Sequence, residues 1–130
     1  MNIPKELKYS KDHEWVRVEG NKAIVGIDDY AQSQLGDVVF VELPEIGADI
    51  ICGDGFSVVE SVKAVSDIYA PVSGKIIEVN EMLADTPECI NEDPYGQGWI
   101  AVIELTDVSE LDKLLDSEAY ERLLEEGEHS

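Results

Sequence analysis

Residues 58–75 read V-V-E-S-V-K-A-V-S-D-I-Y-A-P-V-S-G-K, and this stretch decides the fold. Side chains of the same kind stand at equal distances from a centre between Lys63 and Ala64. The mirrored pairs are Val62 with Val65, Ser61 with Ser66, Glu60 with Asp67, and Val59 with Ile68. Such symmetry predicts a β-hairpin whose two-residue loop is Lys63-Ala64, with Lys63 exposed at the tip.

Two features of this hairpin are unfavourable. Tight two-residue loops favour Gly or Asn, and this loop has neither. Glu60 opposite Asp67 would place like charges across the strands. A sequence that accepts both costs retains these residues for another reason, such as a lysine that other proteins modify or read. On the spacing alone, however, an ordinary solvated loop lysine remains the preferred interpretation of Lys63.

The rest of the chain also consists mostly of short strands separated by turn residues. Alternation and β-branched residues predict strands at 13–18, 23–27, 38–43, 49–51, 56–61, 65–69, 75–79 and 99–105. Asp28 is expected to cap a short helix that runs through Gln34, with Gly36 just past its end. Residues 80–98 are expected to form a loop.

The C-terminal part changes character and is predicted to be helical. Ser109-Glu110-Leu111-Asp112 is similar to a capping box, and leucines then recur at helical spacing. We therefore expect a single mainly β domain over residues 1–130, with a β core at about 1–105 and a helical segment at about 109–126. The fold class is a small β-barrel or sandwich with a short internal helix and C-terminal helices.

Charge and composition exclude some partners. The 130 residues carry 29 acids against 9 bases, a formal net charge of −20. Such a surface repels phosphate backbones, so neither nucleic acid nor an anionic membrane is expected to bind. The same field can speed encounters with proteins that carry basic patches, but solubility alone would explain the charge equally well. No apolar run approaches the roughly 20 residues of a transmembrane helix. The start of the chain lacks targeting patterns, which predicts a cytoplasmic protein.

The two cysteines, Cys52 and Cys89, are expected to be reduced, partly buried thiols, although a disulfide between them stays open. Neither belongs to a C-x-x-C pair, and neither lies at zinc-like spacing from a histidine. Trp15 and Trp99 are expected to anchor the core. His13 beside Glu14 is similar to a general-base pair, but no nucleophile is near it in the sequence, so a structural role is expected.

The motif around Lys63 resembles the lipoyl-attachment motif of lipoyl-bearing carrier domains. The matching residues are Glu60, Ser61, Val62, Lys63 and Ala64, followed by Ser66-Asp67-Ile68 and Ala70-Pro71-Val72-Ser73-Gly74. Further segments resemble the H-protein family of the glycine cleavage system specifically. These are residues 7–15, 25–27, 31–32, 35–44, 91–96, 98–99 and 109–120. The resemblance runs nearly from end to end.

The resemblance implies a carrier and not an enzyme. Its fold would be a lipoyl/biotinyl-carrier-like flattened β-barrel, or hybrid sandwich, with lipoate joined by an amide to Lys63 on a hairpin turn. The lipoyl arm would carry an aminomethyl group from a pyridoxal-phosphate glycine decarboxylase to a tetrahydrofolate-dependent aminomethyltransferase. It would then deliver electrons to dihydrolipoamide dehydrogenase, a flavin enzyme. A lipoate ligase or an octanoyl/lipoyl transferase would attach the group, and the resemblance implies a bacterial cytoplasm.

Family members also fold the loaded arm against a cleft on their own surface, which slows its hydrolysis. Glu14 and Asp67 match positions implied to line that cleft, where a carboxylate could pair with the cationic amine. Asp12 and Gln34 stand where some members carry Ser and His. These two departures add an acid and remove a titratable group, so they leave the docking of the arm open.

Four other functions compete with this one. Biotin carriers usually have Met on both sides of the lysine, whereas Val62 and Ala64 flank Lys63 here. Lipoyl domains of 2-oxoacid dehydrogenase acyltransferases are shorter and precede linkers and a catalytic domain. A relay protein that donates lipoyl or octanoyl groups to other enzymes would use the same lysine, so this alternative stays open. No catalytic constellation supports a true enzyme.

Overall fold

The computed structural model describes residues 2–128, which form β-strands with short helices at their ends. The strands are β1 (Lys8–Tyr9), β2 (Glu14–Glu19), β3 (Lys22–Ile27), β4 (Val38–Glu42), β5 (Asp49–Ile50), β6 (Gly55–Ser61), β7 (Val65–Tyr69), β8 (Gly74–Val79) and β9 (Ala101–Leu105). The helices are α1 (Asp29–Leu35), α2 (Met82–Asp85), α3 (Cys89–Glu92), the 3₁₀ helix η1 (Val108–Lys113) and α4 (Ser117–Glu128).

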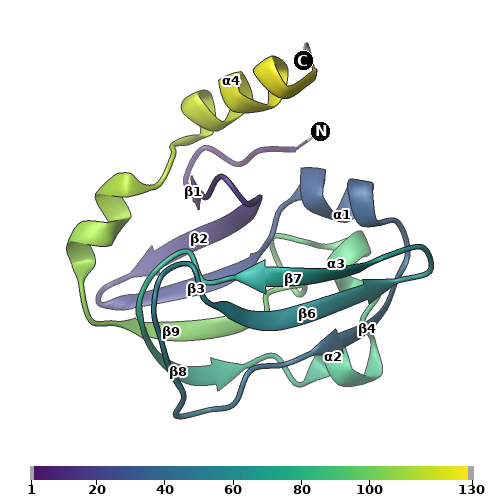
Figure 1. Cartoon of the computed structure of the whole chain (residues 1–130), viewed down its shortest axis with the longest axis horizontal. Coiled ribbons are helices and arrows are strands. Elements are labelled where there is room, and N and C mark those ends of the chain that lie inside the picture. The colour runs from purple at the N-terminus through teal and green to yellow at the C-terminus, as the bar shows by residue number, and fades with distance from the viewer. Residues whose placement is uncertain (1, 129–130) are drawn as a thin grey trace.

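The strands make two antiparallel sheets that pack face to face (Figure 1). One sheet has six strands in the order β1-β2-β3-β9-β8-β5, and the other has three in the order β4-β6-β7. The mainly β fold predicted from the alternating pattern is therefore confirmed. The turn between β6 and β7 lies at one end of the small sheet, near the end of α1.

The main core fills the space between the two sheets, because each strand turns alternate side chains inward. Ile27 of β3, Val59 of β6, Ile68 of β7 and Ile76 of β8 are almost completely buried there. Each such side chain contributes about 1.5–3 kcal/mol when it leaves water. The two sheets are thus held as a rigid base for the β6–β7 turn.

A second apolar cluster attaches α4 to the outer face of the large sheet. Tyr9 and Tyr120 are fully buried and stacked, with ring centroids 4.7 Å apart. Backbone hydrogen bonds of 2.8 Å in both directions join Tyr9 to Leu115, just before α4. Trp15 is fully buried in the same cluster, and Trp99 packs against it, which confirms their expected role as anchors.

The short helix α1 is capped as predicted. The Asp28 side chain accepts a hydrogen bond of 2.8 Å from the Ala31 N–H. The helix extends one residue further than expected, to Leu35. Gly36 follows with φ 77°, a left-handed conformation that favours glycine.

Other boundaries differ from the prediction. The expected loop 80–98 contains α2 and α3, each only four residues long, which is too short to give a periodic signal. The predicted capping box at Ser109 is wrong, because Asp107 caps η1 through a hydrogen bond from the Ser109 N–H. Leu114 is extended, so the helical tail is interrupted before α4 begins.

Two further observations concern thiols and membranes. Both cysteines are free, and Cys52 is exposed, whereas Cys89 is half-buried as predicted. Burial and the nearby Glu110 raise the pKa of the Cys52 thiol. Among residues 2–128, no helix is both long enough and apolar enough to span a membrane.

Candidate functional site: the β6–β7 turn and the adjacent pocket

The predicted hairpin exists, but its predicted register is wrong. β6 and β7 pair Glu60 with Val65 and Val58 with Asp67, so the two-residue loop is Val62-Lys63 and not Lys63-Ala64. The closing pair exchanges a hydrogen bond of 2.8 Å from Ser61 N–H to the Ala64 carbonyl. Glu60 and Asp67 do not face each other directly, which removes the like-charge conflict that the mirrored pairing implied.

The Ser61 hydroxyl explains why this loop forms without Gly or Asn. Its oxygen accepts hydrogen bonds from the backbone N–H groups of Lys63 (3.3 Å) and Ala64 (3.0 Å). A serine that bonds the next backbone groups forms a turn by itself. The Val62 N–H donates to the Asp37 carbonyl at 3.0 Å, which ties the tip of the turn to the segment after α1.

Lys63 is exposed at this tip, as expected from its place in the sequence. Its side chain folds over Gly36, because a Cβ added at Gly36 would lie 3.4 Å from Lys63 Cε and 3.9 Å from Nζ. The lysine amine is therefore held beside the C-terminal end of α1. Backbone bonds fix its base, while its end group stays accessible to another protein.

The other motif residues surround this lysine in different ways. Val62 and Ala64 are exposed beside it, and Glu60 is half-buried on β6. Gly74 lies farther away, where β8 passes β9 very closely. A Cβ at Gly74 would collide with the Glu104 carbonyl oxygen, so only glycine fits there.

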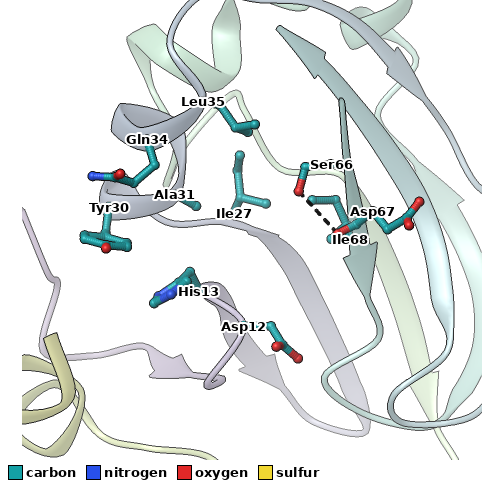
Figure 2. A pocket seen from close by; sticks show the side chains of 10 residues that line it. All are labelled: Asp12, His13, Ile27, Tyr30, Ala31, Gln34, Leu35, Ser66, Asp67 and Ile68. Carbon is teal, nitrogen blue, oxygen red and sulfur yellow. Dashed lines mark hydrogen bonds between the residues drawn. The ribbon is translucent and has the colours of Figure 1, made fainter. Parts of the chain in front are cut away.

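A pocket of about 200 Å³ lies next to the turn, between α1, β7 and the loop before β2 (Figure 2). Its lining residues come from these three places and from the end of β3. They are Asp12, His13, Ile27, Tyr30, Ala31, Gln34, Leu35, Ser66, Asp67 and Ile68. Gln34 and Leu35 directly precede Gly36, over which the Lys63 side chain folds, so the lysine lies beside the C-terminal end of the helix that lines the pocket, although it is not a lining residue itself.

The four residues predicted to form a cleft occupy different positions. Asp12 and Gln34 are exposed and line the pocket. Asp67 contributes to its wall, but Figure 2 shows its carboxylate on the opposite side of β7 from Ser66 and Ile68. Glu14 is not among the lining residues. The pocket therefore presents one carboxylate, that of Asp12, at its rim.

Glu14 is buried, with only 1% of its surface exposed. Burial raises the pKa of its carboxyl to about 7, against the opposing effect of a hydrogen bond of 2.6 Å from Ser10 Oγ. The carboxyl consequently changes charge near neutral pH, and a cation placed nearby would favour the ionised form. Asp12 and His13, the two residues that precede Glu14, line the pocket, whereas Glu14 does not.

Sequence reasoning missed most of the pocket wall. On α1, residues four apart share a face, which brings together the pairs Tyr30 with Gln34 and Ala31 with Leu35. Residues two apart on β7 likewise share a face, which places Ser66 beside Ile68. These periods were readable in the sequence. The approach of α1 to β7 was not, because it depends on the packing of both sheets.

Comparisons with known proteins agree on one family. A family model described as "Glycine cleavage H-protein" matches residues 7–127. A glycine cleavage system H protein of Carboxydothermus hydrogenoformans is 59% identical over 124 residues, covering 95% of each chain. One from a Geobacillus species is 60% identical over 127 residues, covering 98% of this chain and all of the relative. A crystal structure of a glycine cleavage system H protein from Mycobacterium marinum superposes with a TM-score of 0.83 at 42% identity, covering 91% of this chain and 95% of that one.

Proposed function

Because the chain belongs to the glycine cleavage H-protein family, we propose that it is the lipoyl-carrying shuttle of a glycine cleavage system, with lipoate amide-linked to Lys63. The observation that carries this proposal is the placement of Lys63. It is exposed on a turn that Ser61 and Asp37 hold in place, and it lies beside Gly36, which directly follows the pocket residue Leu35. An exposed amine on a fixed base is what an attaching enzyme requires.

The residues of the pocket fit a lipoyl group. Ile27, Ala31, Leu35 and Ile68 give it an apolar floor next to the lysine, which suits a hydrocarbon chain. Each fully buried methylene would contribute about 0.8 kcal/mol to docking. When bound, lipoate supplies a disulfide that takes up electrons together with the aminomethyl group of glycine; that chemistry belongs to the cofactor and to the partner enzymes.

The role of this chain's own residues is to tether and to shelter. Lys63 supplies the amide nitrogen, and the apolar floor excludes water from whatever docks on it. The Asp12 carboxylate at the rim favours a cationic amine over a neutral one. Glu14 follows the same loop and is buried, and because its pKa is about 7, a nearby cation would favour its charged form. The chain itself is proposed to catalyse no reaction.

The partners follow from the proposed cycle. They are a pyridoxal-phosphate glycine decarboxylase, a tetrahydrofolate-dependent aminomethyltransferase, dihydrolipoamide dehydrogenase and a lipoate-attaching enzyme. A chain with a formal charge of −20 is attracted to basic surfaces on such enzymes. Amide formation removes the Lys63 charge and makes the carrier one unit more negative. We treat residues 1–130 as one carrier domain acting in the cytoplasm.

The test is a reconstituted reaction. Lipoylated protein should support exchange of labelled bicarbonate into glycine with the decarboxylase, and the complete cycle with all partners. Lys63→Arg, which keeps the charge but offers a poorer nucleophile to the attaching enzyme, should support neither. Transfer of lipoyl groups to other enzymes without any exchange would favour the relay function instead and would overturn the shuttle.

A further inference from the structure

One wall of the pocket is held from behind by the C-terminal helix. His13 lines the pocket on one side. On its other side lies a second cavity, of about 240 Å³, that it shares with Lys11, Tyr30 and the α4 residues Leu123 and Leu124. A helix remote in sequence from Lys63 therefore contacts the same histidine that faces the pocket.

His13 depends on this contact because its own backbone is strained. It is the single non-glycine residue with positive φ (69°) among residues 2–128. Its ring packs against Tyr30 of α1 at a centroid distance of 4.6 Å and against Tyr120 of α4 at 5.9 Å. Its Nδ1 lies 2.7 Å from the Tyr120 hydroxyl oxygen, which is hydrogen-bonding distance.

The Tyr120 hydroxyl is also a neighbour of the buried acid Asp28, although the two side chains make no hydrogen bond of ordinary geometry. Asp28 is fully buried, and while its Oδ1 accepts from the Ala31 N–H, its Oδ2 has no hydrogen-bond partner within residues 2–128. Leaving a buried carboxylate oxygen unpaired is costly. Burial raises the Asp28 pKa to about 6, and the neighbouring Tyr120 hydroxyl opposes that rise.

A hydroxyl has one proton, so the acceptor to which Tyr120 donates decides which tautomer His13 adopts. If Tyr120 donates to Asp28, the His13 ring must donate its Nδ1–H to the Tyr120 oxygen. In the structure Asp28 Oδ2 accepts no hydrogen bond, so this arrangement requires a small movement that brings the Tyr120 hydroxyl within reach of that oxygen. It would then satisfy both buried groups, whereas donation to His13 leaves Asp28 Oδ2 unpaired. Burial lowers the His13 pKa below its ordinary value, although Asp12 opposes this, which favours the neutral ring. A neutral ring does not repel a cationic amine in the pocket.

We propose that Tyr120 is a positioning residue for the carrier, which fixes the orientation and the Nδ1–H tautomer of His13 in the pocket wall through a hydrogen-bonded chain from His13 to Tyr120 to Asp28. The inference rests on the proposed function, since the pocket matters only if it shelters the loaded arm. It follows that α4 helps to shelter the loaded arm, although no α4 residue lines that pocket.

The test compares two hydroxyl deletions in the same stacked pair. Tyr120→Phe keeps the stack on Tyr9 and removes the bond to His13. Tyr9→Phe, the control, removes a hydrogen bond of 2.6 Å to the Pro4 carbonyl and leaves His13 untouched. Each variant is lipoylated and loaded with glycine and the decarboxylase. Hydrolysis is then followed by mass, after denaturant unfolding has established that both variants are folded in the assay.

We expect Tyr120→Phe to hydrolyse about three- to tenfold faster than the parent, the range that one lost buried hydrogen bond gives. Tyr9→Phe should match the parent. Equal rates for both variants would overturn the inference while leaving the proposed function intact. A parent that is not lipoylated at Lys63, or that loads but is not sheltered, would overturn the proposed function and the inference with it.

A second readout needs no lipoate. Nitrogen-15 spectra of the bare protein report the tautomer of His13, and His129→Gln assigns the signals of the other histidine. The parent should show the Nδ1–H form, and Tyr120→Phe should shift toward the more common Nε2–H form. The Nε2–H form in the parent would refute the hydrogen-bonded chain.

Discussion

The buried carboxyl of Glu14 makes a quantitative prediction about stability and pH. The ordinary pKa of this group is 4.5, and burial raises it to about 7 in the folded chain. At about 1.4 kcal/mol for each pH unit, ionised Glu14 destabilises the fold by about 3 kcal/mol. Between pH 4.5 and 7 the folded chain binds more protons than the unfolded one, so stability falls as pH rises through this window.

Glu14→Gln removes that titration. The variant and the parent should be about equally stable at about pH 3, below both pKa values, where Glu14 is protonated in the folded and the unfolded state. Above pH 7.5 the variant should be more stable by up to about 3 kcal/mol, because it has no charge to bury. Denaturant unfolding at several pH values measures the difference.

Removing any acid from so acidic a chain also relieves general repulsion, so a control is required. Glu45→Gln removes the same formal charge from an exposed turn. It should change stability only slightly, and about equally at all pH values. The reasoning would be refuted if Glu14→Gln gained no more stability at pH 8 than Glu45→Gln, or if it flattened none of the pH dependence. A gain would also indicate that Glu14 is retained for function at the expense of stability.

Three further changes test the frame of the site. Asp28→Asn should raise stability at pH 8, because it keeps the α1 cap without a buried charge. Asp28→Ala loses the cap and should be about 1 kcal/mol less stable than Asp28→Asn. Equal unfolding midpoints for these two variants would count against the role of the cap. Gly74→Ala should lower the free energy of unfolding by about 3 kcal/mol or more, because its Cβ would meet a β9 carbonyl. Gly55→Ala has no atom within 4 Å of the added Cβ and should change thermal unfolding little. Ser61→Ala should speed amide hydrogen exchange in the turn about fivefold; Ser66→Ala is the matched control, and equal exchange in both would disprove the role of the Ser61 hydroxyl.

Local signals in the sequence predicted most of the strands and the α1 cap, because each depends on neighbouring residues only. Alternation identified β6 and β7, and Asp28 with Gly36 marked the two ends of α1. The helices α2 and α3 were missed, since four residues are too few for a helical period to emerge.

The site was less predictable because it depends on register and on packing. The mirrored residues around Lys63 implied a centre one residue too late, since the Ser61 hydroxyl closes the turn earlier. The prediction that Asp67 and Glu14 line the cleft rested only on their match to positions in the family. In the structure, strand parity turns the Asp67 carboxylate away, and burial removes Glu14 from the surface. Nothing in the sequence indicated that Tyr120 contacts His13, because 107 residues separate them.

The central claim is that Lys63 is the attachment lysine, and one measurement tests it most directly. Protein expressed with lipoate and an attaching enzyme is weighed intact and then mapped by peptides. We predict one lipoyl increment, located on the peptide that contains Lys63 and absent from Lys63→Ala, with Lys75→Ala modified like the parent. No increment, or an increment at Lys75, would contradict the claim and leave Lys63 an ordinary solvated lysine on a well-formed turn.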